Sequence, residues 1–242
     1  MPEAAHWLAG RTAVVTGASR GIGRATALAA ARAGARVVLA ARSDTALQGA
    51  AEAIRSEGGE ATPVVTDVSR ADDVERLFQV AADGGRVSAL VCAAGILYKT
   101  PFAETSCATW QETLGVNLTG TFMCCRAAFA AMREGEGGGR IVNIASLSGV
   151  YATDKFPGLA AYNVSKYGVV GLTEAIAVEG RAHGISAVCV SPGAVDTEML
   201  RQANPDLKPG LQPEDVAALI VALLDNPLAP ASGANIPLFS NA

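Results

Sequence analysis

The 242-residue sequence has few of the residues that bind metals or form disulfides. It contains two histidines and five cysteines, an odd number with no CxxC spacing. Cys124 and Cys125 are neighbours within an expected helix, which is a poor geometry for a mutual disulfide. We therefore expect free thiols in a reducing compartment, no structural zinc or other metal site, and no catalytic triad built on histidine.

Charge and long apolar runs are also scarce. The formal net charge is -4 and no basic stretch has interleaved aromatic residues, so nucleic acid is not an expected partner. No run of about 20 uninterrupted apolar residues occurs, so we expect no membrane helix. Residues 1–8 contain Glu3 and lack the apolar core of a secretion signal. These features together predict a cytoplasmic location.

The sequence does contain a regular alternation of apolar β-branched runs and longer alanine-rich helical patterns. Continuous apolar strands alternating with helices predict a parallel sheet covered on both faces. No linker or repeat divides the chain, so we expect one α/β domain over residues 1–242, a doubly wound Rossmann-type sheet of about seven strands. The expected strands are 12–16, 36–41, 61–65, 87–92, 140–145, 185–190 and 234–238, and the expected helices are 22–33, 44–57 (with Asp44 as N-cap), 71–82, 109–132, 159–182 and 213–224.

Tyr162 and Lys166 stand four residues apart within one expected helix. At this spacing both side chains lie on the same face. An ammonium beside a phenol favours the phenolate, so we expect the pKa of Tyr162 to lie below its usual value of about 10. A tyrosine tuned in this way can exchange a proton during carbonyl chemistry. Two ordinary residues on an amphipathic helix would have the same spacing, so the pair needs support from the rest of the chain.

The residues that follow each strand are the candidates for a binding site, because ligands of doubly wound sheets bind beyond the carboxyl ends of the strands. The first strand is followed by the turn Gly17-Ala18-Ser19-Arg20-Gly21-Ile22-Gly23. Glycines permit a tight turn and a close approach to a pyrophosphate, and the helix that follows supplies N–H groups and a positive dipole end. Glycine also serves ordinary turns, but the strand before it and the helix after it favour a dinucleotide site.

The second strand is followed by Ala41-Arg42-Ser43 and lacks the carboxylate that usually binds a ribose 2′-hydroxyl. Arg42, helped by Arg20, could bind a 2′-phosphate through charge-assisted hydrogen bonds. We therefore expect NADP(H) in preference to NAD(H). The alternative is that both arginines are ordinary solvated surface residues.

The remaining strand ends carry smaller features. Asp67 could accept a hydrogen bond from an adenine amino group, or it could cap the next helix. Ala93-Ala94-Gly95 offers a small surface for a ribose. Ser146 could reach a substrate oxygen, with Ser148 as the competing candidate. The turn Ser191–Thr197 is suited to a nicotinamide carboxamide.

The ordered set of motifs resembles the short-chain dehydrogenase/reductase family. The motifs are TGASRGIG, VNLTG with Asn117, IVNIASLSG with Ser146, YNVSK, and SPGAVDT. Each motif alone is modest, but their order and spacing are specific and cover nearly the whole chain. Within the family the pattern is most similar to 3-oxoacyl-acyl carrier protein reductases and related NADPH-dependent reductases.

The resemblance implies roles for individual residues. Tyr162 would be the general acid in carbonyl reduction, or the base in alcohol oxidation, and Ser146 would bind the substrate oxygen. Lys166 would bind the nicotinamide ribose and lower the tyrosine pKa. Asn117 would interrupt its helix and hold a water of the proton relay. The implied cofactor contacts are Gly17, Ser19, Arg20, Gly21, Ile22, Gly23, Arg42, Asp67, Val68, Ala94, Gly95, Tyr162, Lys166, Pro192, Gly193, Val195 and Thr197.

The chain departs from the family pattern in places. Cys92-Ala93-Ala94-Gly95 stands where the family often has Asn-Asn-Ala-Gly, so the asparagines that usually brace the central sheet are missing. The loop between Ser146 and Tyr162 is somewhat long and is expected to line the substrate pocket. Residues 198–212 would form a short substrate lid.

These expectations leave three hypotheses about function. The first is an NADPH-dependent reductase of a 3-oxoacyl thioester or another small ketone. The second is an NAD(P)-dependent dehydrogenase of a secondary alcohol, diol or sugar. The third is a catalytically silent cofactor-binding protein. The alanine-rich helices 109–132 and 159–182, which pair across a two-fold axis in the family, predict a homotetramer or a dimer.

Overall fold

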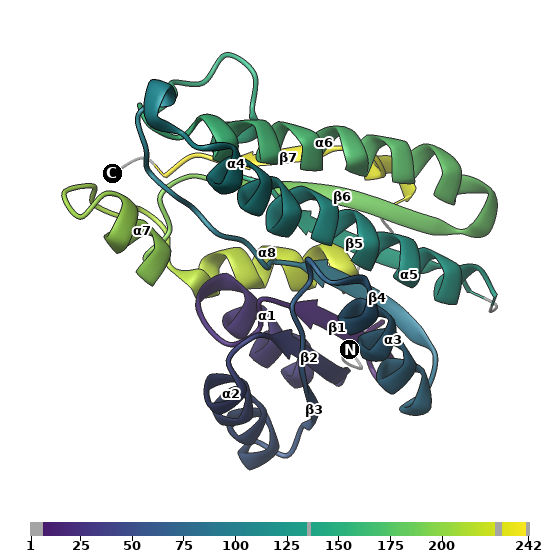
Figure 1. Cartoon of the computed structure of the whole chain (residues 1–242). Coiled ribbons are helices and arrows are strands. Elements are labelled where there is room, and N and C mark those ends of the chain that lie inside the picture. Colours follow the sequence, from purple (N-terminus) through teal and green to yellow (C-terminus); the bar gives the residue numbers. More distant parts are fainter. Residues whose placement is uncertain (1–6, 135–136, 226–228, 241–242) are drawn as a thin grey trace.

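In the computed structural model the strands form one seven-stranded sheet in the order β3-β2-β1-β4-β5-β6-β7, and every neighbouring pair is parallel (Figure 1). The strands are β1 (Thr12–Thr16), β2 (Arg36–Ala41), β3 (Glu60–Val65), β4 (Val87–Cys92), β5 (Gly139–Ile144), β6 (Ile185–Pro192) and β7 (Asn235–Leu238). The predicted Rossmann-type sheet is thereby confirmed. The structure describes residues 7–134, 137–225 and 229–240. The sequence predicts no secretion signal in residues 1–8, and residues 1–6 of this segment lie outside the described residues.

Helices cover both faces of the sheet (Figure 1). They are α1 (Gly21–Arg32), α2 (Asp44–Ser56), α3 (Ala71–Asp83), α4 (Cys107–Leu114), α5 (Thr121–Arg133), α6 (Ala160–Gly180), α7 (Glu198–Ala203) and α8 (Pro213–Asp225). Alternate side chains of a strand point to opposite faces. Ala13 and Val15 of β1 therefore pack in the core with α1, α2 and α8, whereas Val14 packs in the core with α3 and α5.

The helix expected over residues 109–132 is divided. α4 ends at Leu114, a π-helical segment spans Gly115–Gly120, and α5 begins at Thr121. Single π-helical turns inside α-helices occur frequently at functional sites. The apolar periodicity of the sequence continues through this segment, so it could not reveal the change of helix type.

One expected helix start is corrected, and one helix was not expected. The N-cap residue of α2 is Ser43, whose side chain makes no capping hydrogen bond. Asp44 is the first helical residue, and its negative charge still lies at the positive end of the helix. The segment 198–212 contains the short helix α7, which the sequence patterns did not predict. The Thr197 side chain caps α7 by accepting the backbone N–H of Leu200 at 3.3 Å.

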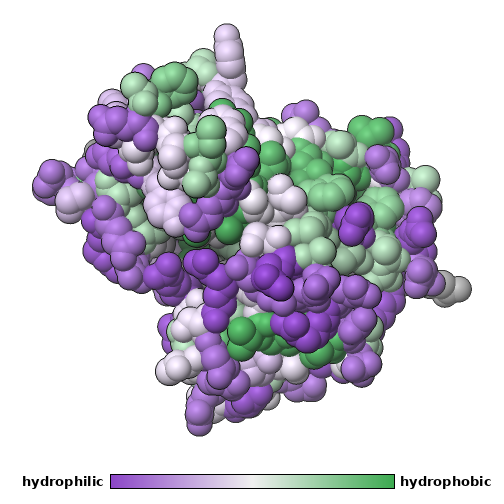
Figure 2. Space-filling view, in the orientation of Figure 1, coloured by the Kyte–Doolittle hydropathy of each residue, from purple (hydrophilic) through white to green (hydrophobic). Residues whose placement is uncertain are grey.

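Apolar residues are distributed unevenly over the face of the molecule in Figure 2. Apolar residues gather on the outer face of the α4–α6 layer in Figure 2, where Phe122, Val164 and Val178 are among the exposed large hydrophobic side chains. Among the described residues, no helix is both long enough and apolar enough to cross a membrane.

Candidate active site

A cavity of about 1130 Å³ opens beyond the carboxyl ends of the strands. One small ligand usually occupies a pocket of roughly 300–1,000 Å³, so this cavity has room for a cofactor together with a substrate. It is lined by every residue predicted to contact a cofactor, and also by Ser146. Asn117 is the one predicted site residue that does not line it.

The glycine-rich turn forms one end of the cavity. Gly17 has φ +66°, and a Cβ added to it would lie 2.7 Å from the carbonyl of Ala93, so this approach of two backbones requires glycine. A Cβ on Gly23 would lie 2.3 Å from the carbonyl oxygen of Gly17. α1 begins at Gly21 with no side-chain cap and no acidic residue in its first turn. Its N–H groups and positive end are therefore available to an anion.

Tyr162, Ser146 and Lys166 form a cluster on the cavity wall. The Tyr162 and Ser146 side chains lie close enough to interact, and Ser146 Oγ accepts the backbone N–H of Ser148 at 3.1 Å. Lys166 Nζ lies 5.5 Å from the centroid of the Tyr162 ring. It donates a hydrogen bond to the carbonyl of Ile144 at 2.8 Å. Of the two competing serines, Ser146 is therefore the one that interacts with the tyrosine.

Burial dominates the ionisation of this cluster. It raises the pKa of Tyr162 above the usual value, and the interaction with Ser146 opposes this shift. Burial also lowers the pKa of Lys166 to about 8, because a low-dielectric surrounding disfavours the charged form. The prediction that Lys166 lowers the pKa of Tyr162 is therefore wrong for this arrangement. The ammonium lies over the ring and bonds to a backbone carbonyl, and the phenol is protonated at neutral pH.

Asn117 lies behind the cavity wall, in the π-helical segment, and is 1% exposed. Its Oδ1 accepts the backbone N–H of Ile96 at 2.8 Å, and its Nδ2 donates to the carbonyl of Ile96 at 2.9 Å and to Ser165 Oγ at 3.0 Å. Ser165 Oγ in turn donates to the Tyr162 carbonyl at 2.7 Å. This side chain therefore ties the segment after β4 to the helix that carries Tyr162.

Arg20 and Arg42 are both exposed where they line the cavity. Arg20 forms a salt bridge with Glu198 of α7, in which the two side chains are 60% and 49% exposed. The same carboxylate accepts a hydrogen bond from the Gln202 amide at 2.9 Å. The glycine-rich turn and the predicted lid are therefore joined by an ion pair at the surface.

Asp67 lines the cavity and folds back on its own chain. Its Oδ1 accepts hydrogen bonds from the backbone N–H of Ser69 at 3.0 Å and from the Ser69 hydroxyl at 2.7 Å. The N-cap residue of α3 is Arg70, which makes no side-chain cap, so the alternative that Asp67 caps this helix is wrong. The Asp67 backbone N–H donates to Asp73 at 2.9 Å, and this bond lowers the pKa of the Asp73 carboxyl.

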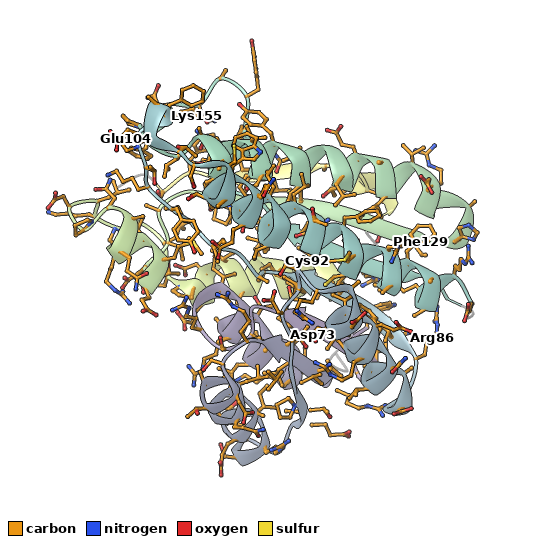
Figure 3. The ribbon with its side chains drawn as sticks, in the orientation of Figure 1. Asp73, Arg86, Cys92, Glu104, Phe129 and Lys155 are labelled. Atoms are coloured by element: carbon orange, nitrogen blue, oxygen red, sulfur yellow. The ribbon has the colours of Figure 1, made fainter. Side chains whose placement is uncertain are left out.

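A chain of buried contacts lies where the family often has asparagines. Cys92 Sγ is 3.9 Å from Cys125 Sγ, Cys125 Sγ is 3.3 Å from Asn143 Oδ1, and Asn143 Nδ2 donates to Thr173 Oγ1 at 3.0 Å. These contacts join β4, α5, β5 and α6 in the middle of the molecule, where Figure 3 labels Cys92. The hydrogen bond with Cys125 and burial raise the pKa of Cys92, so its thiol is neutral. All five cysteines are free, as expected.

Several residues that shape the cavity were not identified from the sequence. Glu198 pairs with the glycine-rich turn, and Ser240 Oγ accepts the backbone N–H of Ala194 at 3.0 Å, which holds the chain end against the turn after β6. Ser165 supports Asn117. Its position three residues after Tyr162 on one helix was the only available indication.

The fold and the residues around this cavity define a class of protein. The chain belongs to the short-chain dehydrogenase family, since the family model with that description matches residues 11–208. It is therefore an NAD(P)-dependent oxidoreductase of this family, whose members act on small molecules.

Two named relatives and two solved structures are similar to this chain over more than nine-tenths of its length. A 3-oxoacyl-[acyl-carrier-protein] reductase from Synechocystis sp. is 38% identical over 231 residues, 92% of each chain. D-threitol dehydrogenase from Mycolicibacterium smegmatis is 35% identical over 95% of this chain and 91% of that one. A short-chain type dehydrogenase/reductase from Mycobacterium marinum has a similar structure, with a TM-score of 0.90 and 34% identity over 96% of this chain and 95% of that one. A provisionally named NAD(P) dependent gluconate 5-dehydrogenase from Beutenbergia cavernae, with NADP bound at low occupancy, has a TM-score of 0.88 and 35% identity over 96% of each chain.

Proposed function

We propose that the protein is an NADPH-dependent reductase that converts a ketone, a 3-oxoacyl thioester or another small carbonyl compound, into a secondary alcohol. The observation that carries this proposal is the grouping of Tyr162 with Ser146 and Lys166 on the wall of the cavity that also contains the glycine-rich turn. The similarity to the reductase from Synechocystis sp. favours a 3-oxoacyl thioester as the substrate.

The residues around the cavity fit a nicotinamide dinucleotide. The backbone cradle that a Cβ on Gly17 or Gly23 would fill lies at the N-terminus of α1 and suits a pyrophosphate. Asp67 would contact the adenine, Gly95 would lie against a ribose, and the turn Pro192–Thr197 would hold the carboxamide. When bound, the cofactor supplies a hydride for the carbonyl carbon.

Side chains of the protein would donate the proton and stabilise the developing negative charge. Tyr162 would donate a proton to the carbonyl oxygen, and its raised pKa keeps that proton available at neutral pH. Ser146 would donate a hydrogen bond to the same oxygen and stabilise negative charge there. Lys166 would bind ribose hydroxyls. Asn117 would act at a distance, by holding the backbone of Ile96 and the start of α6 in place.

Loss of the proposed acid tests the reaction. The protein is assayed with NADPH and NADH against acetoacetyl thioesters and simple ketones, and with NADP+ and NAD+ against secondary alcohols, diols and sugars. Tyr162→Phe should lower kcat by about 10²–10⁴-fold while cofactor affinity, followed by fluorescence, stays the same. Cofactor binding without turnover of any compound, and no effect of Tyr162→Phe, would instead identify a catalytically silent cofactor-binding protein.

The preference for NADPH rests on Arg42 and Arg20. Both line the cavity near the end of β2 and the glycine-rich turn, and a 2′-phosphate could accept charge-assisted hydrogen bonds from them. Arg42→Ala should weaken NADPH binding by about tenfold or more and leave NADH binding nearly unchanged. Equal affinities for the two cofactors, insensitive to this substitution, would contradict the preference.

A dehydrogenase of a secondary alcohol, diol or sugar is the second candidate. It is favoured by the similarity to D-threitol dehydrogenase and to the structure named as a gluconate 5-dehydrogenase. In that direction Tyr162 would accept the proton of the alcohol. The same substrate panel separates the candidates, because a polyol should then be oxidised with a higher kcat/KM than any ketone is reduced.

We also propose that the chain forms a homotetramer or a dimer through the apolar outer face of α5 and α6. Phe122, Val164 and Val178 on this face are 44%, 46% and 70% exposed, and burial of such side chains between copies is favourable. Sedimentation at micromolar concentration tests this, and a monomer alone would contradict it.

A further inference from the structure

The part of the cavity wall that follows Ser146 has an unusual backbone. We call residues 147–156 the substrate-side wall, and its cavity-lining members are Leu147, Ser148, Ala152, Thr153, Asp154 and Phe156. After a short 3-10 turn at Leu147–Gly149 it contains no further helix or strand. Ala152 has φ 58° and is the only non-glycine residue in the described part of the chain with a positive φ. This left-handed conformation is unfavourable for alanine, so other contacts must hold it.

Lys155 supplies contacts of this kind from inside the wall. Its Nζ donates to the carbonyls of Leu147 at 2.9 Å and Val150 at 2.6 Å, and to Thr153 Oγ1 at 2.6 Å. An ammonium has three N–H donors, so each one has an acceptor in the wall. Among the described residues, no carboxylate forms a salt bridge with Lys155. Its charge is therefore satisfied by neutral oxygen atoms of one loop, and it draws the two ends of that loop together.

The same wall rests on α6. The Tyr167 hydroxyl donates to the carbonyl of Val150 at 3.0 Å, and Lys155 Nζ lies 5.2 Å from the centroid of the Tyr167 ring. A Cβ added to Gly149 would lie 2.6 Å from the carbonyl of Lys166, so the first turn of the wall packs directly on the helix backbone. Figure 3 shows Lys155 in the loop above α6, on the side of the molecule away from α1.

We propose that Lys155 is a positioning residue that sets the shape of the substrate-side wall and thereby determines how tightly substrates bind. The proposal rests on the reductase or dehydrogenase function given above. Charge-assisted hydrogen bonds are stronger than neutral ones, so loss of the ammonium releases the turn at Ala152 and the residues beside it. None of these bonds is made to Tyr162, Ser146 or the glycine-rich turn. A looser wall therefore changes substrate binding and leaves the chemical step and the cofactor in place.

The test compares Lys155→Met with two matched tyrosine variants. In Lys155→Met, KM for the best substrate should rise about tenfold, which corresponds to about 1.4 kcal/mol, while kcat and the Kd of NADPH change by less than about twofold. Tyr167→Phe, which removes one bond to the wall, should raise KM by less. Tyr151→Phe is the control, because Tyr151 is 87% exposed and does not line the cavity.

A second readout needs no substrate. Tyr151 is 87% exposed within the wall, and chymotrypsin should cleave after it faster in Lys155→Met than in the unaltered protein. An unchanged cleavage rate overturns the proposal even where no compound is turned over, which separates its failure from failure of the proposed function. It is also overturned if KM in Lys155→Met equals that of the Tyr151→Phe control, or if kcat and NADPH affinity fall together with substrate binding.

Discussion

Two regions of the cavity are built in opposite ways. Around Tyr162 the polar groups are buried and bonded to backbone, as Asn117 is to Ile96 and Lys166 is to Ile144. At the glycine-rich turn, by contrast, Arg20 is 60% exposed and its carboxylate partner Glu198 is 49% exposed. Removing one partner of a buried hydrogen bond lowers the stability of the folded state substantially, because the other partner stays buried and unsatisfied. Exposed ion pairs contribute little to stability and are screened by salt. The difference indicates that the groups proposed to transfer a proton are held by buried bonds, whereas the charges proposed to select the cofactor are held weakly.

The largest expected effect comes from breaking the buried region. Asn117→Ala removes an amide that makes three hydrogen bonds and leaves the N–H and carbonyl of Ile96 without it. The free energy of unfolding should fall by about 3 kcal/mol, and kcat should fall as well, because Ile96 and the start of α6 are no longer joined. Urea unfolding measures the first change. Gln48→Ala, at an exposed amide with one hydrogen bond to Asp44, is the control. Equal losses in the two variants would contradict the contrast between buried and exposed regions.

The free energy of unfolding, measured over a series of pH values, tests whether Lys166 in the buried region is desolvated. The pKa of Lys166 is about 8 in the folded protein, against an ordinary value of 10.5 when exposed. Between these values the unfolded chain binds more protons, so the contribution of Lys166 to stability rises with pH, by up to about 3 kcal/mol in total. Above pH 10 the raised pKa of Tyr162 acts in the opposite direction, because the folded protein then retains the proton.

Lys166→Met tests this contribution. The thiols of Cys92 and Cys189 are electrostatically coupled to Lys166, so the difference in unfolding free energy between the variant and the unaltered protein reports Lys166 together with this coupling. This difference should favour the variant most at pH 7 and decrease as the pH approaches 10. A difference that does not depend on pH would show that the ammonium is not desolvated.

The smallest expected effect comes from changing the exposed ion pair between Arg20 and Glu198. Glu198→Gln removes the carboxylate that competes with a 2′-phosphate for Arg20, so NADPH affinity should increase by up to about fivefold and NADH affinity should hardly change. The gain should disappear in high salt. Glu57→Gln removes an equally exposed pair with Arg32, far from the cavity, and serves as the control. The same change for both cofactors would mean that Glu198 acts only through the lid.

Most of the fold could be predicted from local patterns. The bounds of β1, β2 and β4 coincide with those expected, because each is a short, mainly apolar run that follows a turn and therefore leaves little choice. The residues after the strands were expected to meet because parallel strands bring their carboxyl ends to one edge, and they do line one cavity. The resemblance implied that Asn117 interrupts its helix, and it does, but the π-helical form of this segment and the short helix α7 could not be predicted, since each depends on contacts with elements distant in sequence.

By itself, the sequence determined the order of strands and helices, the position of the glycine turn, and which side chains reach the edge where the strands end. Only the tertiary structure decided the chemistry of those side chains. The pKa of Tyr162 is raised because burial outweighs its interaction with Ser146, and the ammonium of Lys155 has its acceptors because a loop closes around it. Desolvation and loop closure sum over neighbours from the whole chain, and no local pattern of residues contains that sum.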